Sequence, residues 1–231
     1  MQAMDNLAPD RILRDRPLDR AALQALVGRP AHLIGCDLAE CDLSGLDLTG
    51  WRFEQCDLRH ANLAGARLEA SAWRSCRGAM AGFVGADLAE ARFVSCDVNN
   101  AAFRRADLGD AAFTGCKLTG ADLSEARMMR VTFAETLLIG ARMPSQSLRG
   151  ARLQRVDFSQ ADLRQCDFRE AVFEECSLRD ANLASARFDK ADLRGADLGG
   201  LRLIDAGLFR GATISRAQAG QLLAQLGLKL G

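Results

Sequence analysis

The chain has 231 residues, of which 48% are hydrophobic and 26% are charged. Its 30 basic and 30 acidic residues give a formal net charge of +0. This balance argues against a general nucleic-acid binder, and against a rod that imitates the charge of DNA along its whole length. No stretch approaches the length of a transmembrane helix and no signal peptide precedes the repeats, so we expect a soluble, cytoplasmic protein with no membrane contact.

Residues 1–30 precede a regular repeat and are expected to form a tail and a capping helix. Residues 1–16 are polar and poorly periodic, which predicts a mobile tail. A short helix is predicted over residues 19–27, because Asp19 can cap its first turn and Gly28 is a natural stop. We expect this helix to cover the first coil of the repeat.

From Leu33 to Leu208, almost every fifth residue is large and apolar, and the residue two positions earlier is small. Words such as Ala86-Asp87-Leu88 recur along this stretch. A period of five fits neither the 3.6 residues of a helical turn nor the alternation of a strand. The chain must therefore turn once per repeat, and four repeats close a square coil whose neighbours stack about 4.8 Å away.

A second period of twenty residues supports the four-sided coil. Positions twenty apart share a face, and one such column is mostly aromatic: Phe53, Trp73, Phe93, Phe113, Phe133, Leu153 and Phe173. Six of the eight cysteines form another column: Cys36, Cys56, Cys76, Cys96, Cys116 and Cys176. The pattern predicts about nine coils of four repeats, with each cysteine acting as a small buried hydrophobic residue.

These five-residue words resemble the pentapeptide-repeat proteins over about three quarters of the chain. The resemblance implies an all-β solenoid, a right-handed quadrilateral β-helix, here over residues 31–213. Such a fold does not by itself name a function.

Residues 214–231 are expected to form a C-terminal helix and tail. Ser215 and Gln218 have the spacing of a capping box, and an apolar stripe follows. The stripe could cap the last coil, or it could pack on its copy in a symmetric homodimer. The dimer interpretation assigns the interface to five leucines: Leu222, Leu223, Leu226, Leu228 and Leu230.

The stretch from Thr213 to Leu228 is similar to the C-terminal helix of Qnr-type quinolone-resistance proteins and of self-immunity proteins from producers of gyrase poisons. In those proteins the segment makes a head-to-head dimer, which the resemblance implies here. This chain differs from the Qnr proteins because no loop interrupts its repeat.

The candidate partner site is an acidic face. The face centred on Leu48, Leu68, Leu88 and Leu108, called the Leu48 face below, carries six acids: Asp47, Glu69, Asp87, Glu90, Asp107 and Asp110. They could occupy a basic DNA-binding surface of a partner. Alternatively, the Asp before each Leu could bond the backbone of its own turn. Glu69, Glu90 and Asp110 lie outside that repeat position and are the stronger candidates.

An irregular stretch surrounds Pro144. Met129, Leu137 and Ile139 occupy outward positions, whereas Gln146 occupies a small inward one. The region around Leu137, Ile139 and Met143 could be a contact patch, or a distortion that buries these side chains. We favour the distortion. Gly78 is a further irregularity, at a position for a large residue, and Met80 could fill the space beside it.

No catalytic constellation, phosphate loop or metal-ligand spacing is found in the sequence, so we expect no enzyme, cofactor or metal. The predicted function is a dimeric, non-enzymatic binding protein that imitates DNA and engages a type II topoisomerase, DNA gyrase or topoisomerase IV. By resemblance, it would protect that enzyme from inhibitors or modulate its response to them. The alternative is a scaffold or adaptor for an unrelated protein partner.

Overall fold

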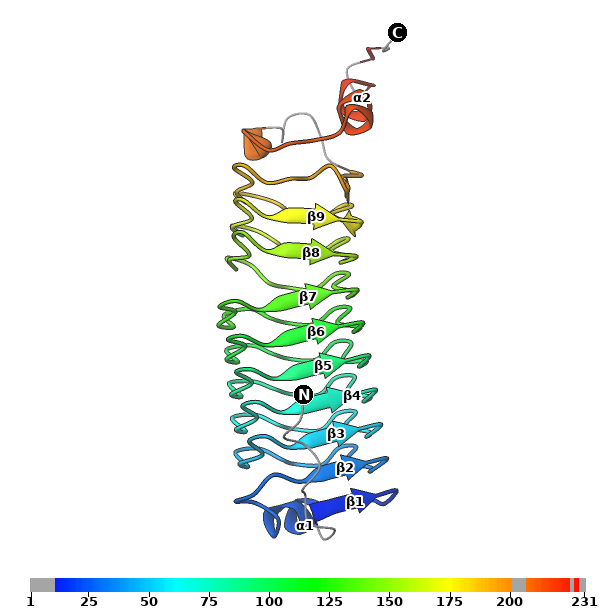
Figure 1. Cartoon of the computed structure of the whole chain (residues 1–231), viewed down its shortest axis with the longest axis vertical. Helices are drawn as coiled ribbons and strands as arrows, with labels where there is room; N and C mark the ends of the chain where they lie inside the picture. The colour runs from blue at the N-terminus through cyan, green and yellow to red at the C-terminus, as the bar shows by residue number, and fades with distance from the viewer. Residues whose placement is uncertain (1–10, 201–206, 225–226, 229–231) are drawn as a thin grey trace, which may run out of the picture.

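The protein is a rod of stacked coils, a parallel β-solenoid with a short helix at each end (Figure 1). The structure, a computed structural model, describes residues 11–200, 207–224 and 227–228. One sheet runs along the rod and its nine strands follow chain order: β1 (Ile12–Arg14), β2 (His32–Ile34), β3 (Arg52–Glu54), β4 (Ala72–Arg74), β5 (Arg92–Val94), β6 (Ala112–Thr114), β7 (Thr132–Ala134), β8 (Arg152–Gln154) and β9 (Val172–Glu174).

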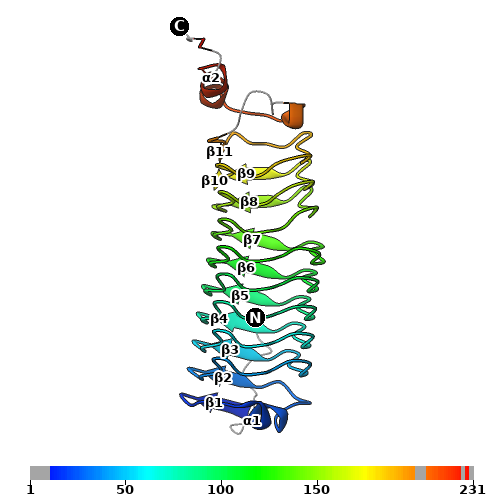
Figure 2. The same cartoon turned by 180° about the vertical axis from the view of Figure 1, so that it is seen from behind.

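Successive strands pair in parallel with partners twenty residues apart, as Phe53 with Trp73. The twenty-residue coil predicted from the columns is therefore confirmed. Near the C-terminal end, β10 (Cys176–Ser177) and β11 (Ala196–Asp197) form a second short parallel pair, seen beside β9 in Figure 2.

The five-residue period arises from one turn per repeat. An Asp before the central residue accepts a hydrogen bond from the backbone N–H two residues later, as Asp87 does from Ala89 at 3.1 Å. The last residue of the repeat turns the chain with positive φ, for example 59° at Glu90. Asp suits the position before the central residue because its short side chain can accept a hydrogen bond from the backbone of its own turn.

The aromatic column fills the core behind the sheet. Its rings stack from coil to coil: the centroids are 4.0 Å apart for Phe53 and Trp73, and 5.3 Å apart for Trp73 and Phe93. Trp73 also donates its indole N–H to the buried hydroxyl of Ser71 at 2.8 Å. A large ring is thus accommodated because its only polar group has a partner.

The cysteine column is also confirmed. Seven of the eight cysteines are buried and Cys41 is half-buried, all as free thiols. The Cys56 thiol donates to the carbonyl of Leu33, and Thr136 makes the same type of bond to Phe113 further along the column. Burial raises the pKa of Cys166 to about 12, which keeps that thiol protonated. In the described ranges, no group of His, Cys, Asp and Glu side chains could hold a metal ion.

The N-terminal end differs from the expectation of a mobile tail over residues 1–16. Residues 1–10 lie outside the described residues, but β1 pairs with β2 across the full strand. Leu13 and Leu18 are buried in the core. They continue the five-residue phase backward from Leu33, so the repeat itself contained the missed signal. The tail prediction is therefore wrong for residues 11–16.

The predicted N-terminal capping helix is present and shorter than expected. It is α1 (Arg20–Gln24), and the Asp19 carboxylate accepts from the N–H of Ala22 at 2.8 Å. Leu23 on this helix is fully buried, which places it against the first coils. Neither α1 nor the C-terminal helix of the described chain is long and apolar enough to cross a membrane.

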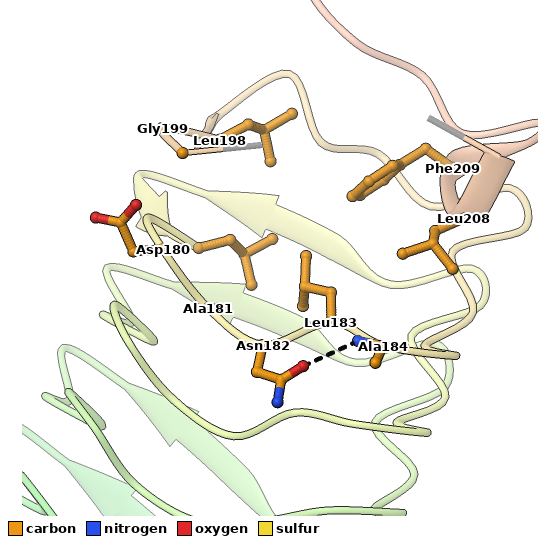
Figure 3. A pocket seen from close by; sticks show the side chains of 11 residues that line it. Asp180, Ala181, Asn182, Leu183, Ala184, Leu198, Gly199, Leu208 and Phe209 are labelled. Carbon is orange, nitrogen blue, oxygen red and sulfur yellow. Dashed lines mark hydrogen bonds between the residues drawn. The ribbon is translucent and has the colours of Figure 1, made fainter. Parts of the chain in front are cut away.

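The repeat does not keep its phase to Leu208. Asp192 pairs with Thr213, twenty-one residues on, and Phe209 rather than Leu208 stacks on Phe188 with centroids 4.7 Å apart. A one-residue shift has therefore entered before Phe209. A cavity of about 310 Å³ lies at this end of the rod. Leu183 and Leu198 are among the side chains that line it (Figure 3).

The C-terminal helix α2 (Arg216–Ala224) begins with the predicted capping box. The N–H of Ser215 donates to Oε1 of Gln218 at 2.6 Å, and the N–H of Gln218 donates to Oγ of Ser215 at 3.2 Å. This reciprocal pair satisfies two backbone donors that the first helical turn leaves free.

Candidate partner-binding faces

The six predicted acids lie together on the Leu48 face. The coil register places Asp47, Arg67, Asp87, Asp107 and Arg127 in one column of successive parallel bridges. Glu69, Glu90 and Asp110 are exposed beside this column. The predicted coil therefore placed these side chains on one face, but their ion pairs were not predicted.

Three of these acids bond their own turns. The carboxylates of Asp47, Asp87 and Asp107 accept from the N–H groups of Thr49 at 3.2 Å, Ala89 at 3.1 Å and Gly109 at 3.0 Å. This is the repeat role considered above as the alternative to partner binding. Because each of these carboxylates uses one oxygen to shape the coil, its presence is explained by folding.

Ion pairs between neighbouring coils neutralise three of the six acids. Asp47 pairs with Arg67 at 3.2 Å, and Asp107 pairs with Arg127. Asp110 accepts two hydrogen bonds from Arg130, at 2.6 and 2.5 Å, and this bonding lowers the pKa of Asp110. Asp110 was one of the stronger candidates, and its charge is compensated.

Glu69, Asp87 and Glu90 have no ion pair in the described part of the chain, and we call these three residues the acidic row. The side chains of Glu69 and Glu90 are exposed, and Asp87 is half-buried. Their charges lie on neighbouring coils of one face. The acidic row is thus the part of this face with charge available to a basic partner.

Lowered aspartate pKa values predict acid sensitivity. Hydrogen bonds from Arg59, Arg164 and Arg169 lower the pKa of Asp57, Asp162 and Asp167 below the ordinary 3.8. Such groups stabilise the folded state above their unfolded pKa, and this contribution is lost as the pH falls through their folded values.

We expect the melting temperature to be level from about pH 7 to about pH 5 and to drop below about pH 4. Thermal melts followed by circular dichroism at low salt check this. A melting temperature that stays level to about pH 3 would refute the assignment.

The predicted dimer leucines are only partly described. Leu222 and Leu223 are half-buried on α2, and Leu228 is 53% exposed. Leu226 and Leu230 lie outside the described residues. The helix also contacts the last described coil. The buried Gln218 amide donates to the carbonyls of Leu193 at 2.7 Å and Ala196 at 2.6 Å.

Sequence reasoning gave Gln218 only its capping-box role. Its contact with the last coil depends on how α2 sits on the rod, and no local pattern records that placement. One side chain therefore begins the helix and satisfies carbonyls that no further coil covers.

The prediction that a distortion near Pro144 buries the outward side chains is wrong for Met129 and Leu137. Gln146 is buried and Met143 is fully buried, whereas Met129 is 66% exposed and Leu137 is 36% exposed. The carbonyl of Met129 accepts from the N–H of Asp110, whereas Leu137 bridges to Lys117 on another column, so Met129 and Leu137 do not form one patch. Ile139 is half-buried.

The space beside Gly78 is not filled as expected. Met80 is 55% exposed, so the prediction that it fills this space is wrong. A Cβ atom at Gly78 would lie 3.2 Å from Cγ1 of Val98, so the next coil already occupies the position.

Comparison with known proteins supports the repeat assignment. A family model described as a pentapeptide repeat region matches residues 30–101 and 86–157, and one described as pentapeptide repeats matches residues 161–200. No curated protein sequence matches the chain.

Several solved structures are similar to the chain. A trypsin-treated QnrB1, a plasmid-mediated fluoroquinolone resistance protein, is 23% identical over 95% of this chain and 97% of its own, with a TM-score of 0.46. HetL, involved in heterocyst differentiation regulation in the cyanobacterium Nostoc sp. strain PCC 7120, is 25% identical over 87% of this chain and 84% of its own, with a TM-score of 0.30.

A second pentapeptide repeat protein from Nostoc PCC 7120 is 32% identical over 51% of this chain and 86% of its own, with a TM-score of 0.28. The two matches to the pentapeptide-repeat-region model together span more than half of the sequence. The chain belongs to the pentapeptide-repeat family.

Proposed function

We propose that the protein is a non-enzymatic binding protein that engages another protein through its outer faces. The large residues at the centres of the repeats are buried from Leu33 to Leu193, with Leu88 and Phe113 at 0% exposure. The inward side chains therefore form the core, and a partner can contact only the outward side chains on the faces between the turns.

The partner we propose is a type II topoisomerase, DNA gyrase or topoisomerase IV. The acidic row carries this proposal, because it sets uncompensated carboxylates along a rod in the way that a DNA backbone presents charge to a basic surface. The similarity of residues 213–228 to the C-terminal helix of Qnr-type and self-immunity proteins supports the same partner. Binding would protect the enzyme from inhibitors or modulate its response to them.

Supercoiling and cleavage assays with purified gyrase test this proposal. At micromolar concentrations, the protein is expected to reduce quinolone-stabilised DNA cleavage or to change the supercoiling rate. A heat-denatured sample of the same chain is the control. Unchanged cleavage and supercoiling would refute the topoisomerase proposal.

The homodimer is a separate proposal. Leu222 and Leu223 are half-buried on α2, and the exposed Leu228 follows the helix, so apolar surface remains for a second copy. We expect Leu222→Asp to convert a dimer into a monomer, because an unpaired charge in an apolar interface is costly.

Light scattering coupled to size-exclusion chromatography measures this change. Gln221→Asp, at an exposed neighbouring position of the same helix, is the matched control and should leave the dimer intact. A wild-type monomer, or a dimer that Leu222→Asp does not disturb, would count against this interface.

A scaffold for an unrelated partner is the second candidate. The exposed Leu137 and the half-buried Ile139 on a face away from the acidic row favour it. A partner captured through this surface should still bind after the acidic row is reversed in charge.

A further inference from the structure

The ladder of backbone hydrogen bonds between successive coils is interrupted on one side of the rod. In a regular coil the N–H of Leu108 donates to the backbone carbonyl of Arg127 at 2.7 Å. The N–H of Asp110 likewise donates to the backbone carbonyl of Met129 at 2.8 Å. One coil further on, within the described residues, the equivalent bonds from Met128 to Ser147 and from Arg130 to Arg149 are absent.

The adjoining strands show the same opening. β6 and β7 pair at three positions, whereas β7 and β8 pair only at Ala134 and Gln154. Figure 1 shows a wider gap between β7 and β8 than between the preceding strands. The opening therefore includes the Leu48 face and the corner that leads to the sheet.

Gln146 accounts for the opening. It occupies an inward position that most other repeats give to Ala or Cys, and it is only 8% exposed. Its Nε2 donates to the carbonyl of Ala126 at 3.1 Å. One coil earlier, the equivalent carbonyl of Ala106 accepts the backbone N–H of Arg127 at 2.9 Å. A side-chain amide thus replaces a backbone bond and holds the coils apart.

The result is a cleft of about 700 Å³ between the two coils. Its apolar lining includes Met128, Val131 and Leu148, which belong to the core. Four arginines also line it: Arg127, Arg130, Arg149 and Arg152. Three of them pair with acids outside the cleft, and Arg152 has no ion pair in the described part of the chain.

We propose that this cleft binds an extended peptide segment in which acidic and apolar side chains alternate. The N–H groups of Met128 and Arg130 lie on one lip, and the carbonyls of Ser147 and Arg149, their expected acceptors, lie on the other. Donors and acceptors that a regular ladder would pair are therefore available to the backbone of an added strand.

The alternation of acidic and apolar side chains in such a segment matches the two sides of the cleft. Successive side chains of a strand point to opposite sides, so apolar ones face the lining near Val131 while acidic ones face the arginines. Arg152 is exposed and free to pair, whereas Arg127, Arg130 and Arg149 must exchange their present partners. Arg152 is therefore expected to contribute most to the preference for acidic peptides.

Binding is measured with a fluorescein-labelled peptide in which Val and Glu alternate over about eight residues. Arg152→Glu is expected to weaken its binding at least about tenfold. Arg92→Glu is the matched control, because Arg92 has the same place on β5, is exposed and has no ion pair in the described chain. Equal effects of the two variants, or unchanged binding by Arg152→Glu, would overturn the proposal.

Backbone recognition is tested separately by hydrogen exchange. The amides of Met128 and Arg130 are expected to exchange faster than those of Leu108 and Asp110, and to slow when the Val-Glu peptide is added. Gln146→Ala restores a small inward residue, so it should close the ladder and abolish binding while the fold is retained. Slow exchange in the free protein, or full binding by Gln146→Ala, contradicts the assignment.

Discussion

Replacing Phe93 by alanine is expected to lower the free energy of unfolding by about 3–5 kcal/mol. The ring is 1% exposed and lies between two others, with centroids 5.3 Å from Trp73 and 4.8 Å from Phe113. In a solenoid each coil contacts only its neighbours, so a cavity in the middle of the rod weakens two interfaces between coils.

Urea unfolding followed by circular dichroism measures this effect. Val94→Ala is the matched control, since Val94 follows Phe93 on β5 and is 36% exposed on the outer side of the sheet. The control should change stability by no more than about 0.5 kcal/mol. A loss below about 1 kcal/mol for Phe93→Ala would mean that the stacked rings do not hold neighbouring coils together.

Reversing the charge of the acidic row is expected to weaken gyrase binding at least about tenfold. The variant combines Glu69→Lys, Asp87→Lys and Glu90→Lys. It replaces the three carboxylates that no arginine compensates in the described chain, so attraction to a basic surface becomes repulsion. Biolayer interferometry with immobilised gyrase measures the change in Kd.

A variant with Glu40→Lys, Glu174→Lys and Glu175→Lys is the control for this experiment. It makes the same change in net charge at exposed positions on other faces. Glu40 and Glu90 also share a place in the turn, with φ of 59° at both. The control should bind as the wild type does. If both variants lose binding equally, net charge rather than the acidic row determines the interaction.

Most of the fold could be predicted because each five-residue repeat forms one side of the coil, so the period of the sequence is the period of the structure. The column from Phe53 to Phe173 identified the inward side of the sheet, and Ser215 with Gln218 identified the start of α2. The strand at Leu13 was missed, although Leu13 and Leu18 are in phase with Leu33. The polar composition of residues 1–16 masks the period there.

The remaining differences depend on packing that the period does not contain. One residue too many before Phe209 shifts the last aromatic contact, and Gln146 opens the ladder because its amide finds a carbonyl acceptor. By contrast, the neutralised acids were readable from sequence. Asp107 and Arg127 are twenty residues apart, so the predicted coil already placed them side by side.

The most direct measurement is an equilibrium titration of labelled protein with purified DNA gyrase, in the absence and presence of linear DNA. We expect a saturable complex at micromolar concentrations, displaced as DNA is added, because under the proposed function the acidic row and the DNA backbone would compete for one basic surface. No complex at these concentrations, or a complex that DNA leaves undisturbed, would contradict a role as a DNA-like ligand of the enzyme.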